Sequence, residues 1–245
     1  KIIEKETNNI YAAKEVSLKQ NNFKKSLIDL YREINILSRL NHPSILKFKG
    51  FNLKNFSNKT KPVIVTEFAS NDSLKAVLKK EREHQPLPNW TDTKKLINLY
   101  GIASAMSYLH QHNIIHRDLK PGNILEDDNL FPKVADFGFS KTLHSNQESV
   151  TVESTIATMG TLTYMSPEIW SSKIYDRPGD VYAFAMIAYE IMTNQVPFEN
   201  YDAMRILTDV VQNKHRPDFN VPIPPVYKHL IEQCWSYNVE DRPTF

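Results

Sequence analysis

Short apolar runs dominate the first part of the chain, residues 1–68. The runs KIIEK, IYAAKEV, ILKFKGF and PVIVTEF have the length and residue types of strands. The letters ETNN between the first two runs predict a hairpin turn, because asparagine tolerates the left-handed backbone conformation. One helix is expected at residues 26–40, ending before Pro43. The predicted apolar face of this helix comprises Leu27, Leu30, Tyr31, Ile34, Leu37 and Leu40.

Beyond residue 70 the pattern becomes mainly helical. Residues 91–112 carry apolar side chains at helical spacing, with Thr91 or Asp92 as the N-cap. Two strand-like pieces, NIL and KVADF, come next, and a long loop rich in Ser and Thr follows them. The apolar run VYAFAMIAYEIM contains Glu190 and is too short to span a bilayer, so it predicts a buried helix. The expected core positions of the helix at residues 91–112 are Leu96, Leu99, Ile102, Ala103, Met106 and Leu109.

These elements predict an α+β fold with two lobes, for which 245 residues are sufficient. We expect a small β-rich N-lobe at residues 1–66, a hinge at 67–70 and a larger helical C-lobe at 71–245. Residues 53–61 and 80–89 are interpreted as surface insertions without an assigned role. A second helical segment is expected around residues 180–193 and another before the end of the chain.

Composition excludes several classes of protein. Hydrophobic residues make up 41% and charged residues 24%, as in ordinary soluble globular proteins. The net charge of +2 gives no reason to expect a nucleic acid partner or an anionic membrane, and no membrane segment is predicted. The single cysteine, Cys234, cannot form an intrachain disulfide and is expected to be a core thiol, which suits a cytoplasmic, reducing compartment.

A polar octamer, HRDLKPGN at residues 116–123, stands between apolar segments where a core would be expected. Alone it would be interpreted as a solvated loop. Eighteen residues after Asp118, however, the tripeptide DFG begins at Asp136, at the end of a predicted strand. Asp118, Asn123 and Asp136 supply two carboxylates and an amide oxygen, which are hard ligands suited to Mg²⁺. DFG alone is a weak signal, whereas the octamer and DFG at this spacing form a specific one.

HRDLKPGN followed by DFG resembles the eukaryotic protein kinase family, and the resemblance extends over nearly the whole chain. It implies a bilobal kinase fold and the cofactors ATP and Mg²⁺. YAAK ends at Lys14, which by resemblance holds the α- and β-phosphates of ATP, and Glu33 orients that lysine. Thr66 in IVTEF resembles the gatekeeper of the adenine pocket. The backbone from Glu67 to Ala69 is implied to hydrogen-bond adenine, and Leu125 completes this nucleotide-binding set.

The resemblance also assigns the reacting groups. Asp118 is implied to accept or orient the proton of the substrate hydroxyl, and Lys120 to neutralise the γ-phosphate. Asn123 and Asp136 are implied to hold Mg²⁺ while Lys14 braces the leaving diphosphate. The resemblance therefore predicts that Asp118, Lys120 and Asn123 are catalytic residues.

Other family landmarks are interpreted as structural. Glu168 closes SPE, where the family usually has APE, and Arg242 in DRPTF is implied to pair with it. Asp180 resembles the aspartate that lies beneath the catalytic loop. His116 is expected to pack rather than react, in a spine that joins the lobes together with Phe137, Leu37 and Phe48.

Smaller signals indicate the substrate class. Lys120, and Thr161 after Gly160, resemble serine/threonine kinases, and the segments DVYAFA, QCW and DRPTF resemble the tyrosine-kinase-like group. The implied activity is phosphorylation of Ser and Thr in protein substrates. Arg117 suggests control by a phosphate on the activation loop, added by another kinase or by autophosphorylation. The candidate positions, left open, are Ser154, Thr155 and Thr158.

Two other function classes were compared with the kinase hypothesis. A pseudokinase that acts as a scaffold or allosteric module would keep the fold and usually lose one motif residue. A phosphate-loop NTPase is excluded, because no GxxxxGK[ST] occurs. The six glycines include no close pair, so the resemblance places the first strand and the glycine-rich loop upstream of Lys1 and the final helix beyond Phe245.

Residues 1–245 alone should bind ATP poorly, because the strand and loop that roof the adenine would be missing, and the piece alone could then be inactive. Isothermal titration calorimetry with Mg·ATP checks this. A dissociation constant in the micromolar range would contradict the expectation.

Overall fold

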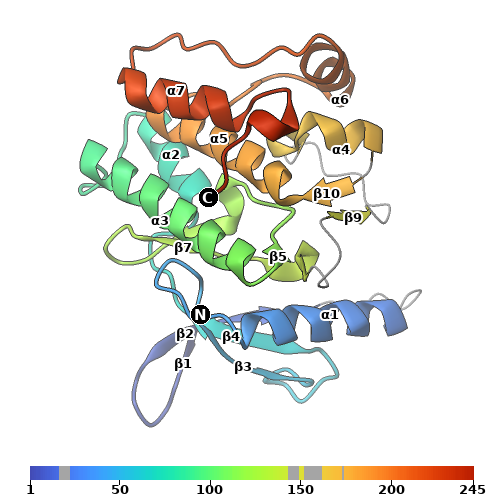
Figure 1. Ribbon diagram of the computed structural model, residues 1–245. Helices are drawn as coiled ribbons and strands as arrows, with labels where there is room; N and C mark the ends of the chain where they lie inside the picture. Colours follow the sequence, from blue (N-terminus) through green and yellow to red (C-terminus); the bar gives the residue numbers. More distant parts are fainter. Residues whose placement is uncertain (17–22, 143–148, 152–161, 173) are drawn as a thin grey trace.

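The computed structural model describes residues 1–16, 23–142, 149–151, 162–172 and 174–245. A small sheet with one helix lies at one end of the molecule, and the other helices gather at the opposite end (Figure 1). The predicted α+β class is therefore confirmed. The sheet is antiparallel, with the strand order β1-β2-β4-β3. Its strands are β1 (Ile2–Ile3), β2 (Ile10–Glu15), β3 (Phe48–Asn52) and β4 (Val63–Glu67).

The hairpin predicted from ETNN is confirmed. Ile3 pairs with Ile10 across β1 and β2, and the turn is closed by two backbone hydrogen bonds. Asn8 N donates to Glu4 O, and Glu4 N donates to Asn9 O, both at 2.9 Å. Asn8 has a φ of 58°, the left-handed conformation for which asparagine is suited.

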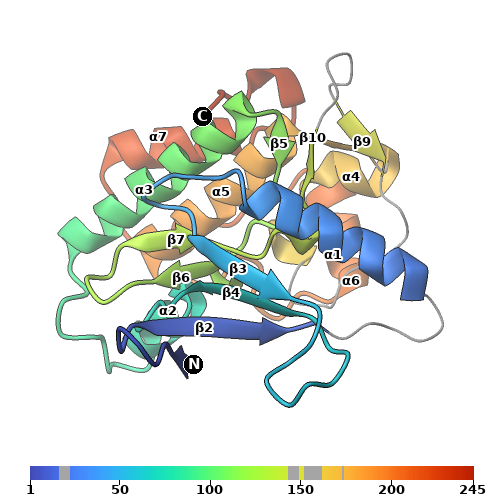
Figure 2. The same ribbon diagram turned by 90° about the horizontal axis from the view of Figure 1, so that it is seen from below.

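Helix α1 (Phe23–Leu37) lies beside this sheet and differs from the prediction in two respects (Figure 2). Tyr31 is 50% exposed, because the buried stripe runs through Leu30, Glu33, Ile34 and Leu37 and leaves Tyr31 at its edge. The helix also ends before the proline loop is reached. The next residues form tighter turns, in which the backbone N–H groups of 39 and 40 donate to carbonyls three residues back.

The helical part begins with two helices that have side-chain N-caps. The Thr91 hydroxyl accepts from Lys94 N, as predicted for one of the two alternatives, and Ser73 caps the preceding helix in the same way. Leu96 is 37% exposed, contrary to its predicted core position. The α-helices are α2 (Leu74–Arg82), α3 (Asp92–Gln111), α4 (Pro167–Ser172), α5 (Arg177–Thr193), α6 (Ala203–Arg205) and α7 (Pro225–Cys234). The segment η5 (Ile206–Gln212) is a π-helix, and η4 (Leu162–Tyr164) and η6 (Val239–Asp241) are 3₁₀ turns.

The interpretation of residues 80–89 as a surface insertion is wrong for its first part. Residues 80–82 are the last turn of α2. Glu81 accepts hydrogen bonds from Trp90 Nε1 at 2.9 Å and from Lys95 Nζ at 2.6 Å. Glu81, in a segment that was interpreted as a surface insertion, therefore ties α2 to the start of α3.

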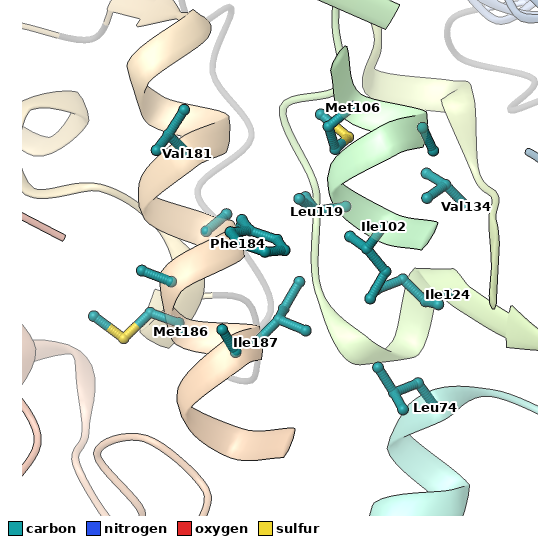
Figure 3. Close-up of a cluster of buried hydrophobic side chains, with 14 of the residues drawn as sticks. Leu74, Ile102, Met106, Leu119, Ile124, Val134, Val181, Phe184, Met186 and Ile187 are labelled. Atoms are coloured by element: carbon teal, nitrogen blue, oxygen red, sulfur yellow. The ribbon is translucent and has the colours of Figure 1, made fainter. Parts of the chain in front are cut away.

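Helix α5 forms the centre of the core and is buried over almost its whole length, as its apolar run predicts. Figure 3 shows Phe184 and Ile187 of α5 facing Ile102 of α3, with Leu119 between the two helices. Burial of each such side chain stabilises the fold by about 1.5–3 kcal/mol. Cys234 is 3% exposed, which confirms the predicted core thiol.

Gly101 lets α3 approach the strands that carry the functional loops. A Cβ atom at this position would lie 2.6 Å from Pro132 Cγ and 3.0 Å from Ser44 Oγ. Neither the proline ring nor the helix backbone can move aside easily. The separation of α3 from strand β7 (Pro132–Val134) therefore depends on the absence of a side chain at Gly101.

Short hairpins place the polar segments predicted from the sequence. The strand predictions NIL and KVADF are confirmed by β6 and β7, which pair with each other. The octamer lies between β5 and β6, and DFG lies between β7 and β8. The strands are β5 (Ile114–Ile115), β6 (Ile124–Glu126), β7 (Pro132–Val134), β8 (Lys141–Thr142), β9 (Ser149–Thr151) and β10 (Ile174–Asp176).

Within the described ranges, no helix has the length and apolar character needed to cross a bilayer. The lobe boundaries at residues 66 and 70 stay predictions, although the chain does pass from the sheet to α2 near them.

Glu126, at the end of β6, is an unusual core residue. It is fully buried, and among the described residues neither of its carboxyl oxygens has a hydrogen-bond partner. Burial raises the pKa of Glu126 to about 8; nearby Asp127 adds to the rise, while Asn98 and Lys94 oppose it. Near neutral pH the folded protein therefore keeps Glu126 largely protonated.

This burial predicts that stability falls with rising pH. The unfolded chain releases the Glu126 proton near the ordinary value of 4.5 and the folded chain near 8, so the unfolding free energy decreases across that window. Glu126→Gln should remove this part of the pH slope. At pH 8 its unfolding free energy should exceed that of the wild type by about 1–3 kcal/mol. Urea unfolding followed by circular dichroism from pH 5 to 8 measures the difference.

The matched control is Glu6→Gln, which changes an exposed glutamate in the β1–β2 turn. It should leave the wild-type pH slope unchanged. Equal slopes for Glu126→Gln and the wild type would contradict the assignment of a neutral Glu126.

Candidate active site

Lys14, Glu33 and Asp136 meet from three different elements. Lys14 belongs to β2, Glu33 to α1, and Asp136 precedes the 3₁₀ turn η3 (Phe137–Phe139). Lys14 Nζ donates to Glu33 Oε1 at 3.4 Å and to Asp136 Oδ1 at 3.1 Å. The structure therefore brings together the lysine and glutamate paired by resemblance and joins them to the first residue of DFG.

The charges of this triad shift the three pKa values in different ways. Burial alone would lower the pKa of Lys14, but the carboxylates of Asp136 and Glu33 hold it above the usual value. Burial alone would raise the pKa of Asp136, yet the adjacent Lys14 ammonium brings it below its usual value. For Glu33, burial outweighs Lys14 and the pKa is raised. The side chains of Lys14 and Asp136 are 55% and 40% exposed, so water screens these interactions.

The polar octamer holds a second set of charges around Asp118. Lys120 Nζ donates to both oxygens of the Asp118 carboxylate, at 2.9 Å and 2.7 Å. Asn123 Nδ2 donates to Asp118 O at 2.7 Å and to Asp118 Oδ2 at 2.8 Å. These contacts fix the Asp118 side chain, which is 9% exposed. All three predicted catalytic residues therefore lie in mutual contact.

His116 connects the Asp118 segment with the Asp136 segment. Its Nε2 lies 3.1 Å from Ala135 O, and its Nδ1 lies 3.3 Å from the backbone N–H of Asp118. Because a carbonyl must accept and an N–H must donate, these contacts assign the proton to Nε2 and leave Nδ1 as the acceptor. Ala135 N also donates to Asn123 O at 2.8 Å. The fully buried His116 ring packs against Phe137, with 5.3 Å between ring centroids, as predicted.

Asp180, near the N-terminus of α5, holds the start of the octamer HRDLKPGN in place. Its carboxylate accepts hydrogen bonds from His116 N at 2.9 Å and Arg117 N at 3.0 Å, and lies 2.9 Å from His110 Nε2. Arg117 adopts a φ of 71°, and Asp136 a φ of 61°. A non-glycine residue in this region carries backbone strain of about 1–3 kcal/mol, which the surrounding hydrogen bonds hold in place.

The predicted nucleotide contacts lie where β4 leads into α2. Thr66 is buried at the end of β4, and its hydroxyl donates to Glu67 O at 3.0 Å. Glu67 N donates to Lys47 O at 2.9 Å, so this amide is already paired within the sheet. Among hydrogen bonds between described residues, the backbone of Ala69 takes part in none. Leu125 is half-buried on β6 and forms a bridge with Ser73.

The structural landmarks downstream are also in place. Arg242 donates to Glu168 through Nη1 at 2.7 Å and Nη2 at 2.9 Å, which confirms the implied pair. Burial would raise the pKa of Glu168, but this guanidinium brings the pKa below its usual value. The predicted activation-loop positions fall outside the described residues: Ser154, Thr155, Thr158, Gly160 and Thr161.

One buried polar cluster was not predicted from the sequence. Glu190 of α5 is 1% exposed; it accepts a hydrogen bond from Tyr164 OH at 2.6 Å and one from Arg82 Nη1 at 3.1 Å. Burial raises the pKa of Glu190, with Tyr164 and Arg82 opposing the rise. An acid inside an apolar run signals that a partner must exist, but the sequence does not say that Arg82, 108 residues away, is that partner.

The donor set around Asn123 and Asp136 fits a hard divalent cation. Asn123 uses its amide nitrogen on Asp118, so its oxygen is the atom that a cation could use. The low pKa of Asp136 keeps its carboxylate ionised. Within the described part of the chain, no group of three or more His, Cys, Asp or Glu side chains forms a metal cluster. A cation here would therefore depend on few protein ligands, as Mg²⁺ sites with bound phosphates do.

Comparison with known proteins agrees with the motifs. The protein kinase domain family matches residues 1–245. A serine/threonine/tyrosine-protein kinase of Arabidopsis thaliana is 35% identical over 215 residues, covering 87% of this chain and 51% of that protein. Another Arabidopsis serine/threonine-protein kinase is 35% identical over 219 residues, covering 87% of this chain and 44% of that kinase. A relative from Acanthamoeba polyphaga mimivirus is 34% identical over 238 residues, covering 96% of this chain and 13% of that protein. The chain therefore spans about half or less of these relatives.

The anchoring role of Asp180 predicts a loss of stability on substitution. Asp180→Asn leaves one acceptor oxygen for two backbone N–H donors, so one buried donor loses its partner. We expect the unfolding free energy to fall by about 1–3 kcal/mol. Urea unfolding measures this change.

Asp209→Asn serves as the control, because the Asp209 carboxylate forms a partly exposed pair with Arg205 and an exposed, long hydrogen bond with Asn213. Its effect should stay below about 1 kcal/mol. If both variants unfolded at the same urea concentration, Asp180 would not be the anchor described.

Proposed function

Because the chain belongs to the protein kinase domain family, we propose that it transfers the γ-phosphoryl group of ATP to Ser and Thr hydroxyls of proteins. The single observation that carries this proposal is the joining of two acid–lysine sets by His116. The pair Lys14–Asp136 and the pair Lys120–Asp118 belong to segments that share hydrogen bonds through His116 and Ala135. Phosphoryl transfer needs positioned charge of this kind more than covalent chemistry.

The proposed nucleotide site lies between the sheet and the helical part. We assign residues 1–66 to an N-lobe, 67–70 to a hinge and 71–245 to a C-lobe. Lys14, oriented by Glu33, would contact the α- and β-phosphates. The adenine-binding residues would be Thr66, Glu67, Ala69 and Leu125, with the backbone of Ala69 supported by its lack of other hydrogen bonds among described residues.

Asn123 and Asp136 would hold Mg²⁺, which supplies neutralisation of charge on the phosphates. The rest of the chemistry belongs to the chain. Asp118 would accept or orient the proton of the substrate hydroxyl, because its carboxylate is held in one position by Asn123 and Lys120. Lys120 would turn from Asp118 towards the γ-phosphate, where its positive charge offsets the negative charge of the transferred group.

A groove beside Lys120 fits the protein substrate. It has a volume of about 640 Å³ and is lined by Lys120, Gly122, Tyr164, Phe198 and Glu199 among others. It adjoins the proposed catalytic pair and is built from α2, η4 and the segment after α5. A peptide in this groove would lie next to Asp118.

The pseudokinase alternative is not favoured. Such a protein would commonly lack one of the reacting residues, whereas this chain keeps the whole set: Lys14, Glu33, Asp118, Lys120, Asn123 and Asp136. We further propose a reducing, cytoplasmic location, supported by the single buried cysteine. Control by activation-loop phosphorylation, by another kinase or by the protein itself, is supported by Arg117 beside Asp118.

The test is Asp118→Asn. Without the carboxylate the substrate hydroxyl loses its proton acceptor, so the rate should fall by at least about 10²- to 10⁴-fold while the fold persists. Transfer of labelled phosphate from ATP to a protein substrate measures the rate, and phosphoamino-acid analysis identifies Ser, Thr or Tyr. Thermal unfolding reports the fold.

Asp128→Asn is the matched control, because Asp128 is an exposed acid in the loop that follows β6. It should keep the wild-type rate. Wild-type turnover by Asp118→Asn would refute the proposed function.

A further inference from the structure

The outer face of the four-stranded sheet carries a groove that the proposed phosphoryl transfer does not use. This groove, here called the sheet groove, crosses all four strands and has a volume of about 680 Å³. Several apolar side chains in it are exposed to a degree uncommon for their type: Ile3 is 60%, Phe51 46% and Phe56 71% exposed. The aliphatic floor comes from Val63 and Val65 of β4. Grouped exposed apolar side chains of this kind mark interaction sites.

The hairpin that borders the sheet groove is strongly basic. No aspartate or glutamate stands between Glu33 and Glu67 in the sequence. The β3–β4 hairpin within this stretch carries a set of exposed lysines, here called the lysine hairpin, and its loop projects from the end of the sheet (Figure 2). Its members are Lys47, Lys49, Lys54, Lys59 and Lys61.

The charges of these lysines are unpaired within the part of the chain that the structure describes. Among the described residues, none of their ammonium groups forms an ion pair; Lys49 instead lies over the Tyr11 ring, 5.4 Å from its centroid. Two carboxylates lie nearby, Glu4 in the lining of the sheet groove and Glu15 beside the hairpin tip, and neither forms an ion pair with these lysines among the described residues. Glu4 accepts hydrogen bonds from Thr7 and from Asn9, and Glu15 accepts one from Asn55 Nδ2 at 3.0 Å. The hairpin thus presents positive charge that a partner could neutralise.

The tip of the lysine hairpin is held in one shape. The Asn55 side-chain oxygen accepts from Ser57 N and from Lys59 N, both at 3.0 Å. Asn58 N donates to Asn55 O at 2.9 Å, with Asn58 in the left-handed conformation at a φ of 58°. A preformed surface loses little conformational entropy on binding.

We propose that the sheet groove and the lysine hairpin form a docking site for an acidic segment of a partner protein that carries aromatic or aliphatic anchors. Apolar side chains of the segment would enter the groove between Ile3, Phe51 and Phe56, and its carboxylates would meet Lys49 and Lys54 at the rim. The volume of the groove is similar to that of small-molecule pockets, about 300–1,000 Å³, so it has room for apolar side chains of such a segment. A flat bilayer is the poorer fit, because it would reach the hairpin tip and leave the hollow in the sheet unfilled.

The site gives the proposed kinase a means of selecting partners away from Asp118. Complementary charge raises the association rate, and apolar anchors slow dissociation. Because binding here needs neither ATP nor phosphoryl transfer, the docking proposal and the proposed activity can fail independently.

The experiment measures fluorescence anisotropy of a labelled synthetic peptide of alternating Glu and Phe. Peptides of alternating Lys and Phe, and of alternating Glu and Ser, test the need for each component. We expect only the Glu/Phe peptide to bind, with affinity decreasing as salt increases. The triple variant Lys54→Glu, Lys59→Glu, Lys61→Glu should lose roughly 10- to 100-fold in affinity, and Phe56→Ser roughly 10-fold.

The control variant reverses three exposed lysines on the helical part: Lys80→Glu, Lys214→Glu and Lys228→Glu. It has the same net charge as the hairpin variant and should bind like the wild type. Thermal unfolding verifies that each variant is folded. Equal binding by the two triple variants, or a Lys/Phe peptide that binds as well as Glu/Phe, would overturn the proposal.

Vesicles of phosphatidylserine and phosphatidylcholine test whether this face binds a membrane instead of a peptide. The wild type should bind them no better than the hairpin variant does. If the vesicles bound the wild type through the lysine hairpin while the Glu/Phe peptide did not bind, this face would be a membrane surface, and the peptide-docking proposal would be wrong.

Discussion

The contact between Asp180 and the backbone of His116 and Arg117 is the constraint from which the rest of the site follows. Asp180 belongs to α5, the most deeply buried helix, so its position is set by the core. Two N–H groups aimed at one carboxylate hold Arg117 in a left-handed conformation, which no ordinary loop preference would maintain. That bend directs the His116 ring inward, where it joins the Asp118 and Asp136 segments. The core thus sets the position of the polar groups.

Electrostatics then divides the acids into different states. Asp136 and Glu33 share one lysine, but burial and geometry shift their pKa values in opposite directions. Asp136 stays ionised beside Lys14 and is suited to a cation, whereas Glu33 is suited to holding Lys14 in place. Glu126, whose carboxyl oxygens have no hydrogen-bond partner among the described residues, is kept neutral mainly by burial, which raises its pKa more than Lys94 lowers it. Residues of one chemical type therefore serve different purposes because their surroundings differ.

Much of the fold was predictable from local signals, and much of the site from motifs. Asn8 and Thr91 act through the adjacent backbone, so the sequence identifies them directly. Tyr31 was misplaced because periodicity gives a stripe but not its edges. The link from Arg82 to Glu190 depends on how α2 packs against α5, and no neighbouring residue encodes that packing. The roles of Asp118 and Asp136 were inferred from resemblance to a family, since spacing alone does not determine chemistry.

Gly101 has a consequence for engineering this fold. Alanine is the best helix former and glycine among the poorest, by about 1 kcal/mol, so a ranking by helix propensity would select Gly101 early for replacement. A methyl group there would collide with Pro132 and push apart α3 and the strand that leads to Asp136. The locally weakest residue of α3 is thus the one that sets its distance from the reacting groups, and thermostabilisation by consensus or propensity should leave it untouched.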